Sequence, residues 1–145
     1  MVAIGSDHAG YELKENIKKY FEENKIEFAD FGTFSSQSCD YPVIAEKVGR
    51  SVSSKETEKG ILICGAGIGM SIAANKIKDV RAALCYEPEL AVLARKHNNA
   101  NVLCMGGRFT NFEKAKEIVK IFLNTDFEGE RHQKRIDLIK KIEKN

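Results

Sequence analysis

Short apolar runs alternate along the chain with longer segments in which apolar residues recur with a period near 3.6. Runs of the first kind predict buried strands, and segments of the second kind predict helices. Regular alternation of the two is typical of βαβ units that build a parallel sheet. We therefore expect an α/β fold with five parallel strands, at residues 2–5, 26–30, 61–64, 82–85 and 102–105.

The segments between these strands carry the helical period. We expect helices at residues 11–24, after Pro42, after the glycine cluster at 65–69, and at 87–97 and 111–124. Pro42 suits the first turn of its helix. A last helix, at about 130–144, has no strand after it. Its apolar positions Ile136, Ile139 and Ile142 therefore need a partner surface, either the domain's own edge or another subunit.

Length and charge narrow the possible classes of protein. A chain of 145 residues fits one domain, 1–145, and 43% apolar with 30% charged residues is typical of a globular fold. The net charge is only +2, and lysines alternate with glutamates. The densest basic cluster, at residues 131–141, is interpreted as a solvated helix face. We therefore expect no nucleic-acid partner.

Features of secretion, membrane insertion and zinc binding are not found. The opening residues MVAIG run directly into a predicted strand, so we expect no signal peptide. No stretch approaches the roughly 20 apolar residues of a membrane span. Cys39, Cys64, Cys85 and Cys104 lack the spacing of a zinc site. We expect a cytoplasmic protein with free thiols and no membrane contact.

Polar residues gather where the predicted strands end, which is where open parallel sheets bind their ligands. SDHAG follows the first strand, CGAGIG closes the third, YEP follows the fourth and GGRF follows the fifth. These motifs should direct five reactive or polar side chains to one edge of the sheet, namely Asp7, His8, Cys64, Tyr86 and Arg108.

The glycine cluster permits three interpretations. It reads G-x-G-x-G from Gly65 to Gly69, one residue shorter than the dinucleotide fingerprint, although Glu87 could imitate the ribose-binding acid. It could also be only a tight turn from strand to helix. Successive glycines at a helix start also expose backbone N–H groups, which stabilise a phosphate or an enediolate oxygen. The same field favours a thiolate at Cys64, which makes it a candidate base or nucleophile.

His97 is a candidate catalytic residue near the end of its predicted helix. It lies seven residues after Leu90 and three after Ala94, on the expected inner face. A lone histidine there can be a packed residue. The polar residues of SDHAG and the adjacent Asn98 favour a catalytic role instead.

Arg131 and Arg135 lie four residues apart, so they share one face of the last helix. Such a pair can bind a phosphate group through its guanidinium forks. Many arginine pairs of this spacing are ordinary surface residues. Together these observations indicate a site for a small anionic substrate.

Five segments resemble the type B ribose-5-phosphate isomerases, a family that also includes allose-6-phosphate isomerases and galactose-6-phosphate isomerase subunits. They are GSDHAGYELK, GTFSSQSCDYP, GILICGAGIGMSIAANK, AVLARKHNNANVLCMGGR and EGERHQKRI, in order along nearly the whole chain. The resemblance implies a Rossmann-like three-layer α/β/α sandwich with an extra C-terminal helix. It also implies a homodimer, in some members paired into a tetramer, with active sites shared between subunits.

The resemblance implies a role for each candidate residue. Cys64 would be the base that moves a proton between C1 and C2, and Asp7 and His97 would assist ring opening. The anion hole for the enediolate would be Gly65, Ala66, Gly67, Ile68 and Gly69. The remaining substrate contacts would be His8, Tyr41 and Asn98 at the sugar and Arg108, Arg131 and Arg135 at the phosphate. The partner chain would supply residues 97–108, and no metal or cofactor is implied.

Two positions distinguish this chain from other members of the family that it resembles. Ala66 stands where many relatives have threonine or serine, so that hydroxyl is missing, although backbone donors remain. Met70 stands where another branch has a glutamate base. The chain therefore resembles the cysteine branch.

Three classes of function remain: a sugar-phosphate isomerase, a nucleotide-binding oxidoreductase domain and a non-catalytic phosphosugar sensor. The joint presence of Cys64, Asp7 and His97 argues against a sensor. Galactose-6-phosphate isomerases usually need two different chains, so a complete set in one chain favours a self-sufficient homo-oligomer. The preferred sugar, with five or six carbons, stays open.

Overall fold

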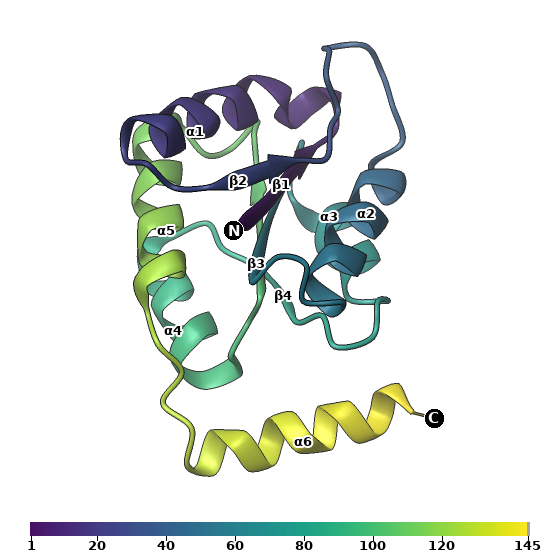
Figure 1. Ribbon diagram of the computed structural model, residues 1–145, viewed down its shortest axis with the longest axis vertical. Coiled ribbons are helices and arrows are strands. Elements are labelled where there is room, and N and C mark those ends of the chain that lie inside the picture. The colour runs from purple at the N-terminus through teal and green to yellow at the C-terminus, as the bar shows by residue number, and fades with distance from the viewer. Residues whose placement is uncertain (145) are drawn as a thin grey trace.

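The computed structural model describes residues 1–144 of the chain. One parallel sheet forms its centre, in the strand order β2-β1-β3-β5-β4. The strands are β1 (Val2–Ser6), β2 (Phe28–Asp30), β3 (Lys59–Cys64), β4 (Ala82–Leu84) and β5 (Val102–Gly106). Figure 1 shows helices on both faces of this sheet. The predicted three-layer α/β/α sandwich is therefore confirmed.

Three helices cover one face of the sheet and two cover the other. The first group is α1 (Tyr11–Glu23), α4 (Pro88–Asn98) and α5 (Phe112–Asn124), and the second is α2 (Tyr41–Ser53) and α3 (Ile68–Ala74). A short 3-10 helix, η1 (His8–Gly10), is not predicted by the sequence pattern. It forms because the Asp7 carboxylate accepts hydrogen bonds from two backbone N–H groups. A capping interaction of this kind produces no periodic pattern of apolar residues in the sequence.

Both faces of the central strands are buried, and alternate residues enter different cores. In β3, Ile61 and Ile63 pack with the α1 and α5 side, whereas Leu62 and Cys64 pack with the α2 and α3 side. Burial on both faces explains why these strands read as continuous apolar runs. The register places Cys64 at the carboxyl end of the sheet, next to α3.

The helix α4 returns antiparallel to the strands and therefore ends at the opposite edge. Just beyond this helix, the Asn101 N–H donates to the carbonyl of Arg81, which precedes β4. The Asn101 carbonyl accepts from the N–H of Gly60, near the start of β3. Leu90 does not lie on the inner face as expected, because it is 44% exposed. Ala94 packs inward as expected, and Ala91 rather than Leu90 lies beside it on the buried face.

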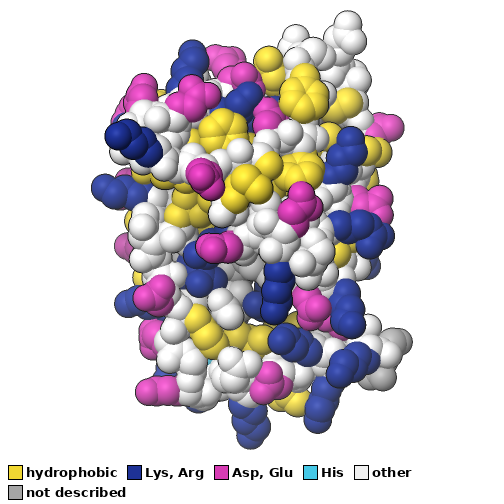
Figure 2. Space-filling view, viewed as in Figure 1, with side chains coloured by type: hydrophobic (Ala, Val, Ile, Leu, Met, Phe, Trp, Pro, Cys, Tyr) yellow, Lys and Arg dark blue, Asp and Glu magenta, His cyan; other side chains and the backbone are white. Residues whose placement is uncertain are grey.

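The last helix, α6 (Arg131–Glu143), lies across the bottom of Figure 1 beside the end of α4. The domain's own edge buries Ile136, but Ile139 and Ile142 stay 43% and 72% exposed. Figure 2 shows Lys and Arg side chains gathered along this helix. The chain by itself therefore covers only part of the apolar face of α6. None of the helices within residues 1–144 has the length and apolar character needed to cross a membrane.

A fully buried lysine anchors the segment that follows β2. Lys14 Nζ donates to both carboxylate oxygens of Asp30, at 2.7 and 2.9 Å, and to the Thr33 carbonyl oxygen at 2.6 Å. Lys18 Nζ lies 2.8 Å from the same carboxylate. Burial opposes the charge on Asp30, yet the hydrogen bonds from the two lysines outweigh it and lower the pKa of Asp30.

We expect Asp30→Asn to destabilise the fold by about 3–5 kcal/mol, because Lys14 would keep a buried charge without its partner. Chemical denaturation at neutral pH measures this loss. The double variant Lys14→Met/Asp30→Asn should lose less, since no unpaired charge remains. The Asp30 contribution should be present above about pH 4 and disappear as the pH falls through the lowered pKa. Equal losses in the single and double variants would contradict this account.

Candidate active site

Cys64 ends β3 with its side chain turned toward the glycine loop. The thiol is buried, and the Gly67 N–H donates a hydrogen bond to Cys64 Sγ at 3.2 Å. The N–H groups of the first turn of α3 precede the first helical hydrogen bond, which Ser71 donates to Gly67. Because α3 has only seven residues, these individual N–H groups matter more than a helix dipole. The arrangement offers backbone donors to the sulfur and to an oxygen bound nearby.

Two residues from other elements close over this loop. A Cβ at Gly69 would lie 2.6 Å from the Tyr41 ring, and one at Gly65 would lie 3.3 Å from the Arg108 guanidinium. Tyr41 comes from the start of α2, and Arg108 follows β5. The glycines therefore allow an aromatic ring and a cation to approach the backbone beside Cys64.

Asp7 and His8 lie at the same edge, after β1. Asp7 Oδ1 accepts from the N–H groups of Ala9 and Gly10, at 2.9 and 3.1 Å. The Cys39 N–H donates to His8 Nδ1 at 3.2 Å. Since Nδ1 is an acceptor there, a neutral His8 carries its proton on Nε2. Both side chains are thus held in fixed orientations at the same carboxyl edge of the sheet as Cys64. We call this edge the thiol edge.

His97 and Asn98 lie at the opposite edge of the sheet. The His97 ring stacks on His132 from α6, with ring centroids 4.3 Å apart, and Glu128 Oε1 lies 4.0 Å from His97 Nε2. Arg131 and Arg135 extend from the same helix and are exposed. His132 was not among the residues predicted for the site, although its position between two arginines in ERHQKRI was an available signal.

His132 is the buried member of this second group. Its Nε2 atom has no hydrogen-bond partner among the described residues. Burial lowers the pKa of His132, and the positive charge of Arg131 lowers it further. The ring is therefore neutral at pH 7, and an anion placed beside it would favour its protonation.

Three potential metal ligands, His97, Glu128 and His132, come within 4.8 Å of one another, which sequence spacing did not indicate. The two imidazoles are nearly parallel, with an interplanar angle of 12°. A metal lies in the plane of each imidazole that binds it, at about 2.0–2.1 Å. Parallel stacked rings do not direct their lone pairs to one point, so this geometry does not favour a metal. The expectation of metal-free activity stays a prediction.

The candidate residues thus form two groups at opposite edges of the sheet. Figure 1 shows the segment after β2 at the top and α6 at the bottom. The six residues of β3 at about 3.3 Å each separate the edges by roughly 20 Å. This distance is too large for Cys64 and His97 of one chain to act on the same sugar ring. Arg108, expected from the partner chain, instead lies against Gly65 of its own chain.

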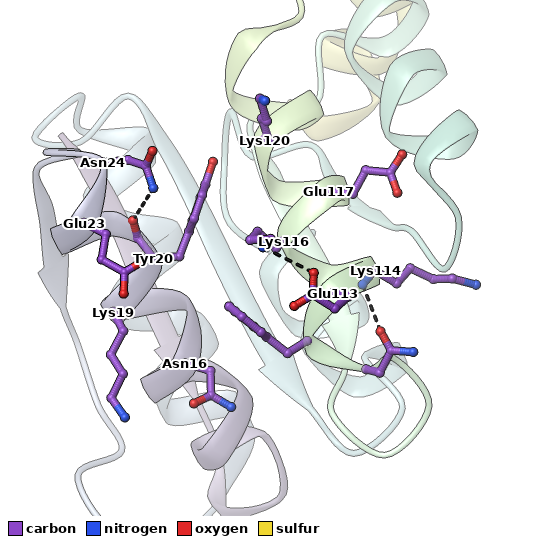
Figure 3. A pocket seen from close by; sticks show the side chains of 12 residues that line it. Asn16, Lys19, Tyr20, Glu23, Asn24, Glu113, Lys114, Lys116, Glu117 and Lys120 are labelled. Atoms are coloured by element: carbon purple, nitrogen blue, oxygen red, sulfur yellow. Dashed lines mark hydrogen bonds and ion pairs between the residues drawn. The ribbon is translucent and has the colours of Figure 1, made fainter.

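A groove of about 940 Å³ between α1 and α5 lies outside both groups. Figure 3 shows lysine, glutamate and asparagine side chains along its walls, with an ion pair between Lys116 and Glu113. None of the candidate residues lines it. Its size alone therefore does not mark it as the active site.

The fold and the thiol edge together define a Rossmann-like α/β/α enzyme for a small polar substrate, with its chemistry at the carboxyl ends of parallel strands. Comparison with known proteins identifies the family. A family model described as Ribose/Galactose Isomerase matches residues 2–139. The chain therefore belongs to this family.

Similar proteins cover nearly the whole chain. Ribose-5-phosphate isomerase B of Escherichia coli K12 is 46% identical over 142 residues, which are 98% of this chain and 95% of that protein. The structure of the Clostridium thermocellum ribose-5-phosphate isomerase B matches with a TM-score of 0.97 at 44% identity, over 99% and 97% of the two chains. The Mycoplasma genitalium enzyme, solved with bound ribulose-5-phosphate, matches with a TM-score of 0.94 at 42% identity, over 99% and 96%.

We expect Gly67→Ala to destabilise the fold by about 2–5 kcal/mol. Gly67 has φ of +82°, and a Cβ there would lie 2.6 Å from Leu84 Cδ1 and 2.8 Å from the Met105 backbone. Gly129 is the matched control, because its φ is +73° but its Cβ would meet nothing within 4 Å. Gly129→Ala should cost only about 1–2 kcal/mol of backbone strain. Thermal unfolding of both variants tests whether packing around the loop adds to the strain, and equal losses would contradict it.

Proposed function

We propose that this chain interconverts ribose 5-phosphate and ribulose 5-phosphate, with Cys64 as the base. The observation that carries the proposal is the Gly67 N–H directed at Cys64 Sγ, within a loop whose other N–H groups can receive an anion. Membership of the isomerase family and the similar ribose-5-phosphate isomerases support the same reaction. A nucleotide cofactor is not needed, because the hydrogen moves as a proton within one substrate.

The reaction begins with opening of the sugar ring, which Asp7 and His97 assist by proton transfer. The Cys64 thiolate then removes the proton from C2 of the open aldose, and the electron pair moves toward the C1 oxygen. Loop N–H groups stabilise the enediolate. A proton passes from the C2 oxygen to the C1 oxygen, and the sulfur returns its proton to C1. Atoms and charge balance without a metal or a redox partner.

The phosphate is held by the second group of residues, supplied by another copy of the chain. Arg131 and Arg135 provide guanidinium donors, and the buried His132 ring lies between them in sequence. His97 and Asn98 of that copy then face the sugar, beside His8 and Tyr41 of the first. Arg108 belongs to the thiol side of the shared site. In a homodimer, the thiol edge of each chain meets the α6 edge of the other, which forms two sites. The exposed face of α6 is available for this contact.

We propose the cytoplasm as the compartment, since Cys39, Cys64, Cys85 and Cys104 are all free thiols. The sugar preference is tested by one assay that compares ribose 5-phosphate with allose 6-phosphate and galactose 6-phosphate. The proposal expects the highest kcat/KM with ribose 5-phosphate. A higher value with either six-carbon substrate would assign the chain to another branch of the family.

We expect Cys64→Ala to lower kcat by about 10²- to 10⁴-fold with little change in KM, because a positioned base is lost while the phosphate contacts remain. Arg135→Ala should chiefly raise KM. Steady-state kinetics on both variants separate the two roles. In D₂O, the wild-type enzyme should incorporate deuterium at the carbon that receives the proton, whereas hydride transfer would incorporate none. Near-normal kcat in Cys64→Ala would place the base elsewhere, with Asp7 next to test.

We expect a mixture of the inactive homodimers Cys64→Ala and His97→Ala to regain about a quarter of wild-type activity after subunit exchange. Half of the dimers are then mixed, and one of their two sites has both native residues. Exchange is followed independently by native mass spectrometry. No recovery despite complete exchange would show that Cys64 and His97 of one chain serve the same site.

A further inference from the structure

Tyr86 follows β4 and lies half-buried at the carboxyl edge of the sheet. Its hydroxyl donates a hydrogen bond to the carbonyl oxygen of Ala66, inside the glycine loop. Its ring packs edge-on against Phe109, with ring centroids 6.3 Å apart. The reaction described above gives Tyr86 no part, although the sequence motif YEP placed it at this edge.

The peptide group between Ala66 and Gly67 is hydrogen-bonded at both of its ends. Its carbonyl accepts from Tyr86, and its N–H donates to Cys64 Sγ. Because the peptide group is planar and trans, its C=O and N–H point in opposite directions, so fixing one fixes the other. A hydrogen bond to the carbonyl also polarises the amide and strengthens its N–H as a donor.

Residues of two neighbouring strands pack closely around this peptide. A Cβ at Gly106 would lie 2.8 Å from the Ala66 backbone, so β5 closes one side of the loop. Leu84 of β4 lies against Gly67, two residues before Tyr86. The β4 strand and the residues just after it therefore supply both the hydroxyl and part of the packing against the loop.

We propose that Tyr86 is a positioning residue for Cys64, which orients the Ala66–Gly67 peptide so that its N–H stabilises the thiolate. The inference rests on the proposed role of Cys64 as base. Tyr86 keeps its own proton throughout, and the proton transferred between the two carbons passes only through the sulfur.

Tyr86→Phe tests this assignment, because it removes the hydroxyl and keeps the ring against Phe109. The rate of alkylation by iodoacetamide is measured at Cys64 by peptide mass spectrometry as a function of pH. We expect alkylation about three- to tenfold slower near neutral pH, the effect of losing one hydrogen bond that supports the charge. The acidic limb of the kcat/KM profile should move to higher pH, by the shift that accounts for the slower alkylation. KM should change little. Tyr20→Phe, which removes a phenol from the groove of Figure 3, should change neither measurement.

An unchanged pH dependence of alkylation in Tyr86→Phe would overturn the inference. A lower kcat with unchanged alkylation would also overturn it, since the hydroxyl would then act on the substrate. The alkylation measurement does not depend on turnover. If Cys64→Ala retains kcat, the proposed base fails, but the effect of Tyr86 on the sulfur is still measured.

Discussion

Parallel pairing of all five strands is the constraint on which the arrangement of functional groups depends. When strands run in one direction, their carboxyl ends share one edge, and every helix that returns ends at the other edge. Asp7 and Arg108 follow strands, and Cys64 ends one, so all three lie at the first edge. His97 lies near the end of a helix, at the second edge. A single chain therefore holds the thiol group and the α6 group of residues apart, and the site proposed above combines them by pairing two copies.

The glycine loop satisfies a packing requirement and a chemical one with the same residues. Gly67 adopts a left-handed conformation and fits between Leu84 and the Met105 backbone, where no side chain has room. That same conformation turns its N–H toward Cys64 Sγ. The side chain of Ala66 takes no part in this geometry, because the donor belongs to the backbone. Support for the sulfur is therefore built into the fold.

The two edges differ in the groups that they present. At the thiol edge, the backbone of the glycine loop lies against the Tyr41 ring and the Arg108 guanidinium. The α6 edge carries arginines beside a neutral, buried His132, and a phosphate dianion there would be met by several donors. Beside the thiol edge, Lys14 holds the segment after β2 through Asp30 and Thr33, and this segment also carries the N–H that orients His8.

The pattern of apolar residues was enough to predict the five strands, the six longer helices and much of the thiol edge, but not the short η1. Strands buried on both faces must be apolar throughout, and residues that follow parallel strands must share an edge, so Asp7, Cys64 and the loop could be placed from order alone. Only the tertiary structure decided which groups belong to opposite edges, that Arg108 stays with its own Gly65, and that His132 stacks on His97. It also decided that Tyr86 bonds to Ala66. Such contacts depend on side-chain direction across elements far apart in the chain, and residue order does not encode them locally.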